Sequence, residues 1–195
     1  MRIRIKGFTF ETTYSAAALV SIIVITGKNT SWAMCTLAVV IHELGHIFAM
    51  KLCSLTPSGI HISAFNIRII EKERHNTGFV KDIIITACGP AFNFAAYLLF
   101  IFLFDDFAYV NLFLGLFNIL PAVSLDGGQL LYMVLSKRFD PGVASRIIDI
   151  LTIITTVSLF SVELLLLFSS VYNLSLLFIS VYLLLTLFFK KDKYL

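Results

Sequence analysis

Charged residues are scarce in this sequence. They make up 14% of the 195 residues, whereas hydrophobic residues make up 58%. A water-soluble domain carries about 25% charged residues, so the composition excludes an ordinary soluble globular protein. The basic residues also form no stripe with interleaved aromatics, which argues against a nucleic-acid partner.

Cysteine is almost absent, and a cleavable signal peptide is not evident. Cys35, Cys53 and Cys88 are isolated and odd in number, which argues against a disulfide framework. The basic N-terminus is followed by no small-residue cleavage site after a clear apolar core. We therefore expect the first apolar segment to remain as a membrane anchor.

Long apolar runs are abundant instead, and they indicate a mainly α-helical membrane protein with about six spans. The fourth run is interrupted by Pro121 and by Asp126-Gly127-Gly128. The predicted spans cover approximately residues 12–27, 31–53, 81–104, 107–136, 143–162 and 164–189.

The basic residues test this set of spans. If alternate loops face the cytoplasm, fourteen of the fifteen basic residues lie on the cytoplasmic side, and only Lys28 lies outside. By the positive-inside rule, this distribution predicts a multi-pass protein of the cell membrane with both termini in the cytoplasm.

Residues 54–80 differ from the apolar runs. They alternate polar with apolar residues and end in the turn signal Asn76-Thr77-Gly78, which is typical of strands. Residues 2–10 alternate similarly. Because an open sheet edge cannot face lipid, we expect a small β-sheet or hairpin at the cytoplasmic membrane interface.

The segment His42-Glu43-Leu44-Gly45-His46 lies inside the second predicted span. Positions i and i+4 of a helix share a face, so the two histidines can bind one ion, and Glu43 can reach a metal-bound water. Gly45 allows another backbone to approach closely. Chance and core packing would explain such a pattern in a soluble chain. Inside a span, however, ionisable side chains are costly and mark function.

Zinc in a catalytic site needs a third protein ligand, and Asp126 is the best candidate. The other acidic residues lie in turns, in charged stretches or near a basic residue, whereas Asp126 lies within a span without a basic neighbour in sequence. At about 1.5 Å per helical residue, all three ligands lie roughly 7–17 Å from the predicted cytoplasmic ends of their spans. A lone acid that caps a broken helix is the alternative.

Together these motifs resemble the site-2 protease family of intramembrane zinc metalloproteases, peptidase family M50. HELGH (42–46) matches the family's HExxH, and N-I-L-P-A-V-S-L-D-G (118–127) matches its N-x-x-P-x-x-x-L-D-G. G-P-A-F-N (89–93) is similar to its G-P-x-x-N. The paired match is specific, and it covers roughly residues 1–136.

The resemblance implies a single domain, residues 1–195, with a catalytic core of about 1–136 and C-terminal helices of about 143–189. It implies that His42, His46 and Asp126 hold one Zn²⁺ and that Glu43 is the general base. The implied activity is endopeptidase cleavage of a membrane-embedded or membrane-tethered protein near the cytoplasmic face of the lipid bilayer.

Asn93 and Asn118 are implied to support the substrate backbone or the transition state. An interhelical hydrogen bond is the alternative for both residues.

The chain is most similar to the sporulation-type branch, without that branch's C-terminal CBS domain and without a PDZ insertion. This branch suggests regulated proteolysis of a transcription-factor precursor or an anti-sigma factor, and a separate membrane regulator is left open. A metal transporter and an inactive membrane scaffold remain as alternatives. A transporter would need ligands at several depths, and a scaffold would leave Glu43 unexplained.

Overall fold

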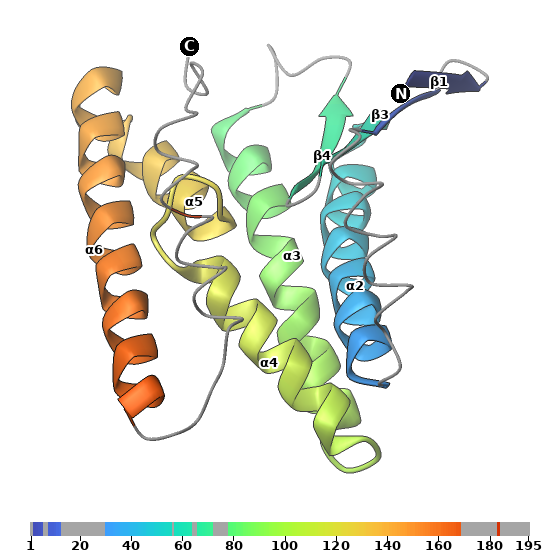
Figure 1. Ribbon diagram of the computed structural model, residues 1–195. Coiled ribbons are helices and arrows are strands. Elements are labelled where there is room, and N and C mark those ends of the chain that lie inside the picture. Colours follow the sequence, from blue (N-terminus) through green and yellow to red (C-terminus); the bar gives the residue numbers. More distant parts are fainter. Residues whose placement is uncertain are drawn as a thin grey trace. The chain divides into compact units, whose positions relative to one another are not determined.

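Helices form most of the part of the chain that the computed structural model describes, namely residues 2–5, 8–12, 30–55, 57–63, 66–71, 78–168 and 183. The helices there are α2 (Thr30–Leu52), α3 (Phe79–Phe100), α4 (Asp105–Ile119), α5 (Asp126–Leu135) and α6 (Pro141–Phe168) (Figure 1).

Three of the described helices are long and apolar enough to cross a membrane. These candidate spans are Ala33–Leu52, Phe79–Phe100 and Pro141–Val162. They coincide with three of the predicted spans, 31–53, 81–104 and 143–162. The predicted spans 12–27 and, for the most part, 164–189 lie outside the described residues, so the number six stays a prediction.

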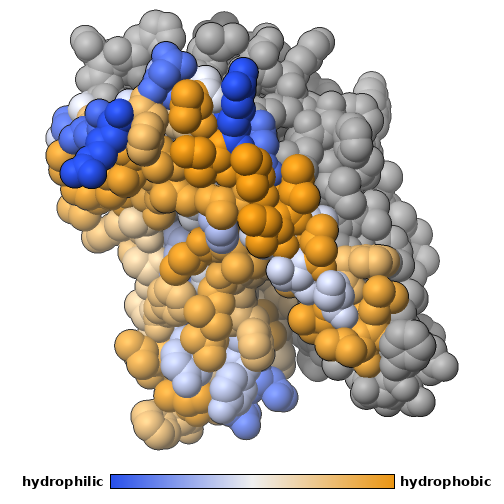
Figure 2. All heavy atoms as spheres, turned by 90° about the vertical axis from the view of Figure 1, so that its left-hand side faces the viewer, coloured by the Kyte–Doolittle hydropathy of each residue, from blue (hydrophilic) through white to orange (hydrophobic). Residues whose placement is uncertain are grey.

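The surface agrees with a lipid environment. Apolar side chains fill most of the described surface between the hydrophilic residues near the top and bottom of the face in Figure 2. Many large apolar residues are exposed on the helices, for example Leu98 on α3 and Ile150 on α6. In water such exposure would be unfavourable, whereas lipid tails are as apolar as these side chains.

One predicted boundary is wrong. The predicted spans 143–162 and 164–189 place a boundary at Glu163, but α6 continues through this residue to Phe168. The segment S-V-E-L-L-L-L-F contains no Gly, Pro or Asn. Leu and Glu are good helix formers, so a single charged residue does not end the helix.

By its contacts, the chain divides into two units, residues 1–115 and 116–195. Within the first unit, α2 and α3 pack along each other, and a cluster of Ala49, Met50 and Ile85 is buried between them. Within the second unit, α5 packs against α6. The single domain over residues 1–195 stays a prediction.

A small sheet also belongs to the first unit. Its strands β1 (Arg2–Ile5), β2 (Phe8–Thr12), β3 (Pro57–Ser63) and β4 (Asn66–Glu71) follow one another in the order β1-β2-β3-β4. The outer pairs, β1–β2 and β3–β4, are antiparallel, and β2 pairs with β3 in parallel. These strands fall in the two segments whose alternation predicted strands. Their location at the cytoplasmic membrane interface stays a prediction.

The C-terminus of α2 is closed by a pair of hydrogen bonds. The Leu55 N–H donates to the Met50 carbonyl over 2.9 Å, and the Ser54 N–H donates to the Lys51 carbonyl over 3.1 Å. This is the Schellman arrangement, and Leu55 also packs against the cluster that contains Met50. Ser54 adopts a φ of 59°, a left-handed conformation that is unfavourable for any residue except glycine.

We expect Ser54→Gly to stabilise the protein by about 1 kcal/mol, because glycine adopts this conformation without the clash of a Cβ atom. Thermal unfolding of the purified protein in detergent measures the change. Ser136→Gly is the matched control: Ser136 caps α5 with a φ of −64°, so glycine removes no strain there. A melting temperature that rises equally in both variants would contradict the explanation.

Candidate metal centre

Helix α2 carries His42 and His46 one turn apart on the same face. His42 is buried with 6% of its surface exposed, and His46 is half-buried. Their ring centroids lie 4.8 Å apart and the ring planes meet at 83°. The two Nε2 atoms are separated by 3.2 Å. The expected pairing of the two imidazoles through i, i+4 spacing is therefore present in α2.

The other nitrogen of each ring is held by an oxygen atom of α3. The Nδ1 atom of His46 lies 2.8 Å from the Ile85 carbonyl oxygen. The Nδ1 atom of His42 lies 2.7 Å from Oδ1 of Asn93. A carbonyl oxygen only accepts, so each Nδ1 carries a proton and donates it. In the neutral rings the lone pairs are consequently on the Nε2 atoms, which face each other.

This arrangement fits a metal ion. Histidines that bind a metal usually donate their other ring N–H to a carbonyl or carboxylate, which sets the tautomer and the ring orientation. Two Nε2 lone pairs at 3.2 Å repel each other unless a proton or a cation lies between or beside them. Imidazole nitrogen is also a preferred ligand of zinc.

Two glycines bring α3 close to these rings. A Cβ atom at Gly45 would meet the Cys88 carbonyl oxygen, and a Cβ atom at Gly89 would meet the Nε2 and Cε1 atoms of His46. The expectation that Gly45 allows a close backbone approach is thus confirmed. The role of Gly89 was not foreseen: it leaves space for both imidazoles.

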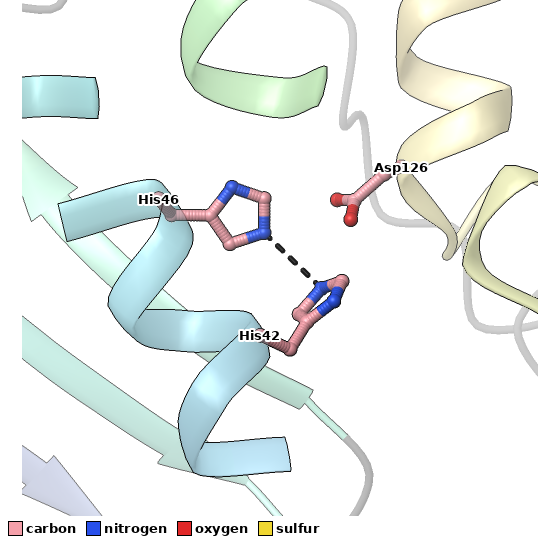
Figure 3. A group of neighbouring side chains, drawn as sticks. All are labelled: His42, His46 and Asp126. Atoms are coloured by element: carbon pink, nitrogen blue, oxygen red, sulfur yellow. Dashed lines mark hydrogen bonds between the residues drawn. The ribbon is translucent and has the colours of Figure 1, made fainter. Parts of the chain in front are cut away.

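Asp126 is the first residue of α5 and is half-buried. Among the described residues, His42, His46 and Asp126 are of types that could together hold a metal ion. Figure 3 draws the three side chains: His42 and His46 come from α2, and Asp126 comes from the start of α5. Two nitrogens and a carboxylate oxygen are a suitable donor set for zinc.

The second unit positions Asp126 through a helix break. Pro121 cannot continue a helix, and α4 ends at Ile119. The first turn of α5 then packs so closely on this break that a Cβ atom at Gly127 would meet the Ile119 carbonyl, and one at Gly128 the Ala122 carbonyl. A carboxylate at a helix N-terminus is also favoured by the helix dipole.

The remaining predicted site residues are placed as follows. Glu43 lies next to His42 on α2 and is half-buried. Asn93 is fully buried, and its hydrogen bonds are interhelical: it accepts from His42 and donates to the Ala38 carbonyl and to Asn111. Asn118 is half-buried in the last turn of α4. The roles assigned to these three residues by resemblance stay predictions.

Comparison with known proteins agrees with the motifs. Residues 98–162 match the family described as Peptidase family M50. Stage IV sporulation protein FB of Bacillus subtilis (strain 168) is 28% identical over 133 residues, which are 63% of this chain and 46% of that protein. The chain is thus similar to peptidase family M50 over about a third of its length. The chain spans about half the length of this curated relative.

The fold is similar to that of a solved site-2 protease. The site-2 protease from Methanocaldococcus jannaschii superposes with a TM-score of 0.67, at 20% identity, over 97% of this chain and 94% of that chain. This similarity establishes the fold of the chain, whereas the chemistry has to be argued from the residues.

We expect Gly89→Ala to weaken zinc binding by at least about tenfold, the lower end of the effect of changes around metal ligands. The new methyl group would meet His46 and would lie 2.9 Å from Cε1 of His42, so the rings would have to move. Competition with a chelator measures the affinity. Gly78→Ala is the matched control, because a Cβ atom there has nothing within 4 Å. Equal zinc affinity in the two variants would contradict the assigned role of Gly89.

Proposed function

We propose that this protein is a zinc-dependent intramembrane endopeptidase. In this proposal His42, His46 and Asp126 hold one zinc ion, and Glu43 is the general base. The facing Nε2 atoms of His42 and His46, 3.2 Å apart with both Nδ1 protons donated to α3, are the observation that carries it. The match of residues 98–162 to peptidase family M50 supports the type of reaction.

Each residue would have a separate task. Bound zinc would supply Lewis-acid chemistry at the scissile carbonyl and would activate the attacking water. Glu43 would accept the proton of that water and deliver it to the leaving amine. Asn118 would support the substrate near the helix break. The apolar surroundings would limit the access of bulk water to these groups.

The proposed substrate is a membrane-embedded or membrane-tethered protein, cleaved near the cytoplasmic face. The distribution of basic residues supports cytoplasmic termini. A transcription-factor precursor or an anti-sigma factor is the class that we favour, with a separate membrane regulator. The curated relative is named as a stage IV sporulation protein, which agrees with the resemblance of the motifs to the sporulation-type branch.

Cleavage requires an extended substrate, because a peptide bond inside a helix is shielded. We propose that the sheet receives it by strand addition. The strand-like region 59–72 is the acceptor that we favour. Since β3 pairs with both β2 and β4, the strand of this region that lies at the edge of the sheet is β4 (Asn66–Glu71).

Proline tests the β4 edge, because it removes one backbone donor and is tolerated on an edge strand where its N–H faces outward. Replacing Ile67, Arg68 and Ile69 one at a time should produce folded variants at the outward positions, and these should lose cleavage. Cleavage of a co-expressed, tagged single-span substrate is measured in cells. A folded β4 variant with an outward-facing proline that cleaves as fast as the wild type would contradict strand addition.

Glu43→Gln distinguishes a protease from the alternatives. Removing the general base should reduce cleavage by about 10²- to 10⁴-fold while zinc affinity is retained, since the ligands are unchanged. Asp126→Ala is the comparison variant and should lose both cleavage and zinc. Cleavage is scored against tagged single-span proteins, and zinc by metal analysis of the purified protein.

A transporter or a scaffold predicts a different outcome. Glu43→Gln would then leave zinc uptake into proteoliposomes or partner binding intact, and no candidate substrate would be cut by the wild type in a way that depends on Glu43. Purified wild type that stays metal-free after zinc loading would reject the metal centre itself.

A further inference from the structure

Asn111 is a polar residue in an apolar part of α4, and it has no part in the metal centre described above. Its side chain is fully buried, as is that of Asn93. An amide in such surroundings is costly unless its donors and acceptor are hydrogen-bonded. The Asn111 Nδ2 group donates to the carbonyl of Phe107, one turn earlier, over 2.9 Å.

This bond sets the orientation of the Asn111 amide. With Nδ2 directed at Phe107, the Oδ1 atom faces Asn93 and accepts from its Nδ2 group over 3.0 Å. The second N–H of Asn93 donates to the Ala38 carbonyl, also over 3.0 Å. Both donors of Asn93 are thus used, and its Oδ1 atom faces Nδ1 of His42.

The orientation decides which nitrogen of His42 can bind a metal. Because Asn93 presents its oxygen, Nδ1 of His42 must be the protonated nitrogen, and the Nε2 lone pair faces the metal centre. A reversed Asn93 amide would present an N–H group to Nδ1. The proton of His42 would then move to Nε2, and the ring could not bind the ion there.

We propose that Asn111 is a positioning residue that acts through Asn93 to hold His42 in its metal-binding tautomer. The proposal rests on the proposed zinc site. It also assigns Asn93 to the support of His42, since three of its four hydrogen-bonding positions are occupied by protein groups. His46 needs no such support, because its Nδ1 donates to a backbone carbonyl.

The test compares the zinc affinities of Asn93→Leu, Asn111→Leu and the double variant, each purified as the full chain in detergent. Leucine has nearly the shape of asparagine and no polar atoms. Asn93→Leu should weaken zinc binding about 10- to 100-fold, as other losses of a partner of a ligating histidine do. Asn111→Leu should weaken it by about tenfold, although Asn111 does not touch the ligand.

The double variant separates a positioning role from a merely structural one. If Asn111 acts through Asn93, the double variant should bind zinc almost as tightly as Asn93→Leu. A further loss of up to about twofold is within the usual deviation from additivity. Multiplicative losses would overturn the proposal, as would an Asn111→Leu variant with wild-type affinity. A wild type that binds no zinc would instead reject the proposed function and the inference with it.

A second pair of variants keeps the test open if leucine prevents folding. Asn111→Thr retains a hydroxyl that can donate to Phe107 and accept from Asn93, as Thr152 on α6 donates to Ile148 and accepts from the Val123 N–H. Asn111→Val has the same shape without the hydroxyl. The threonine variant should bind zinc more tightly than the valine variant, and the visible spectrum of the Co²⁺-loaded protein should be closer to that of the wild type.

Thr156→Val serves as the control for the loss of a buried polar group. Thr156 is 2% exposed, and within the described part of the chain its hydroxyl donates to the Thr152 carbonyl on its own helix. Zinc affinity and the Co²⁺ spectrum should stay as in the wild type. Equal affinities of Asn111→Thr and Asn111→Val would overturn the proposed role of Asn111.

Discussion

Two imidazole nitrogens that face each other at 3.2 Å are the constraint on which the first unit of this protein depends. Without other contacts, the repulsion between their lone pairs would rotate the two rings away from each other. The rings stay in place because each donates its other N–H to an oxygen of α3, and this requires α2 and α3 to be unusually close. The glycines at 45 and 89 permit that distance. The close packing of α2 and α3 is therefore what orients the two histidines.

In the second unit, the break between α4 and α5 places a carboxylate at the start of a helix. A carboxylate at the start of a helix needs an interrupted span, and an interrupted span has backbone groups without helical partners. Here the Val123 N–H donates to the Thr152 hydroxyl on α6 over 3.0 Å. Ala122 and Leu125 bury their side chains with Leu183. Irregular backbone is thus satisfied by a neighbouring helix.

Much of this arrangement could be predicted from the sequence, because its signals are local. The spacing of His42 and His46 is a property of one helix, and Pro121 ends a helix wherever it occurs. The direction of the Asn93 amide could not be predicted, since it depends on Asn111 and Ala38, 18 and 55 residues away. Asn111 was not singled out from the sequence, although a polar residue in the run F-A-Y-V-N-L-F-L is a signal that could have indicated it. At Glu163 a lone charge was given too much weight against a long helix-forming segment.

The two histidines differ in what supports them, and this difference bears on how the protein can change over generations. The partner of His46 is a main-chain oxygen at position 85, which persists whatever side chain replaces isoleucine there. The partner of His42 is a side chain, that of Asn93, and Asn93 is oriented in turn by the side chain of Asn111. Natural substitutions that change the affinity for the ion should therefore accumulate around His42. A laboratory search for variants with altered metal affinity would best begin at Asn93 and Asn111.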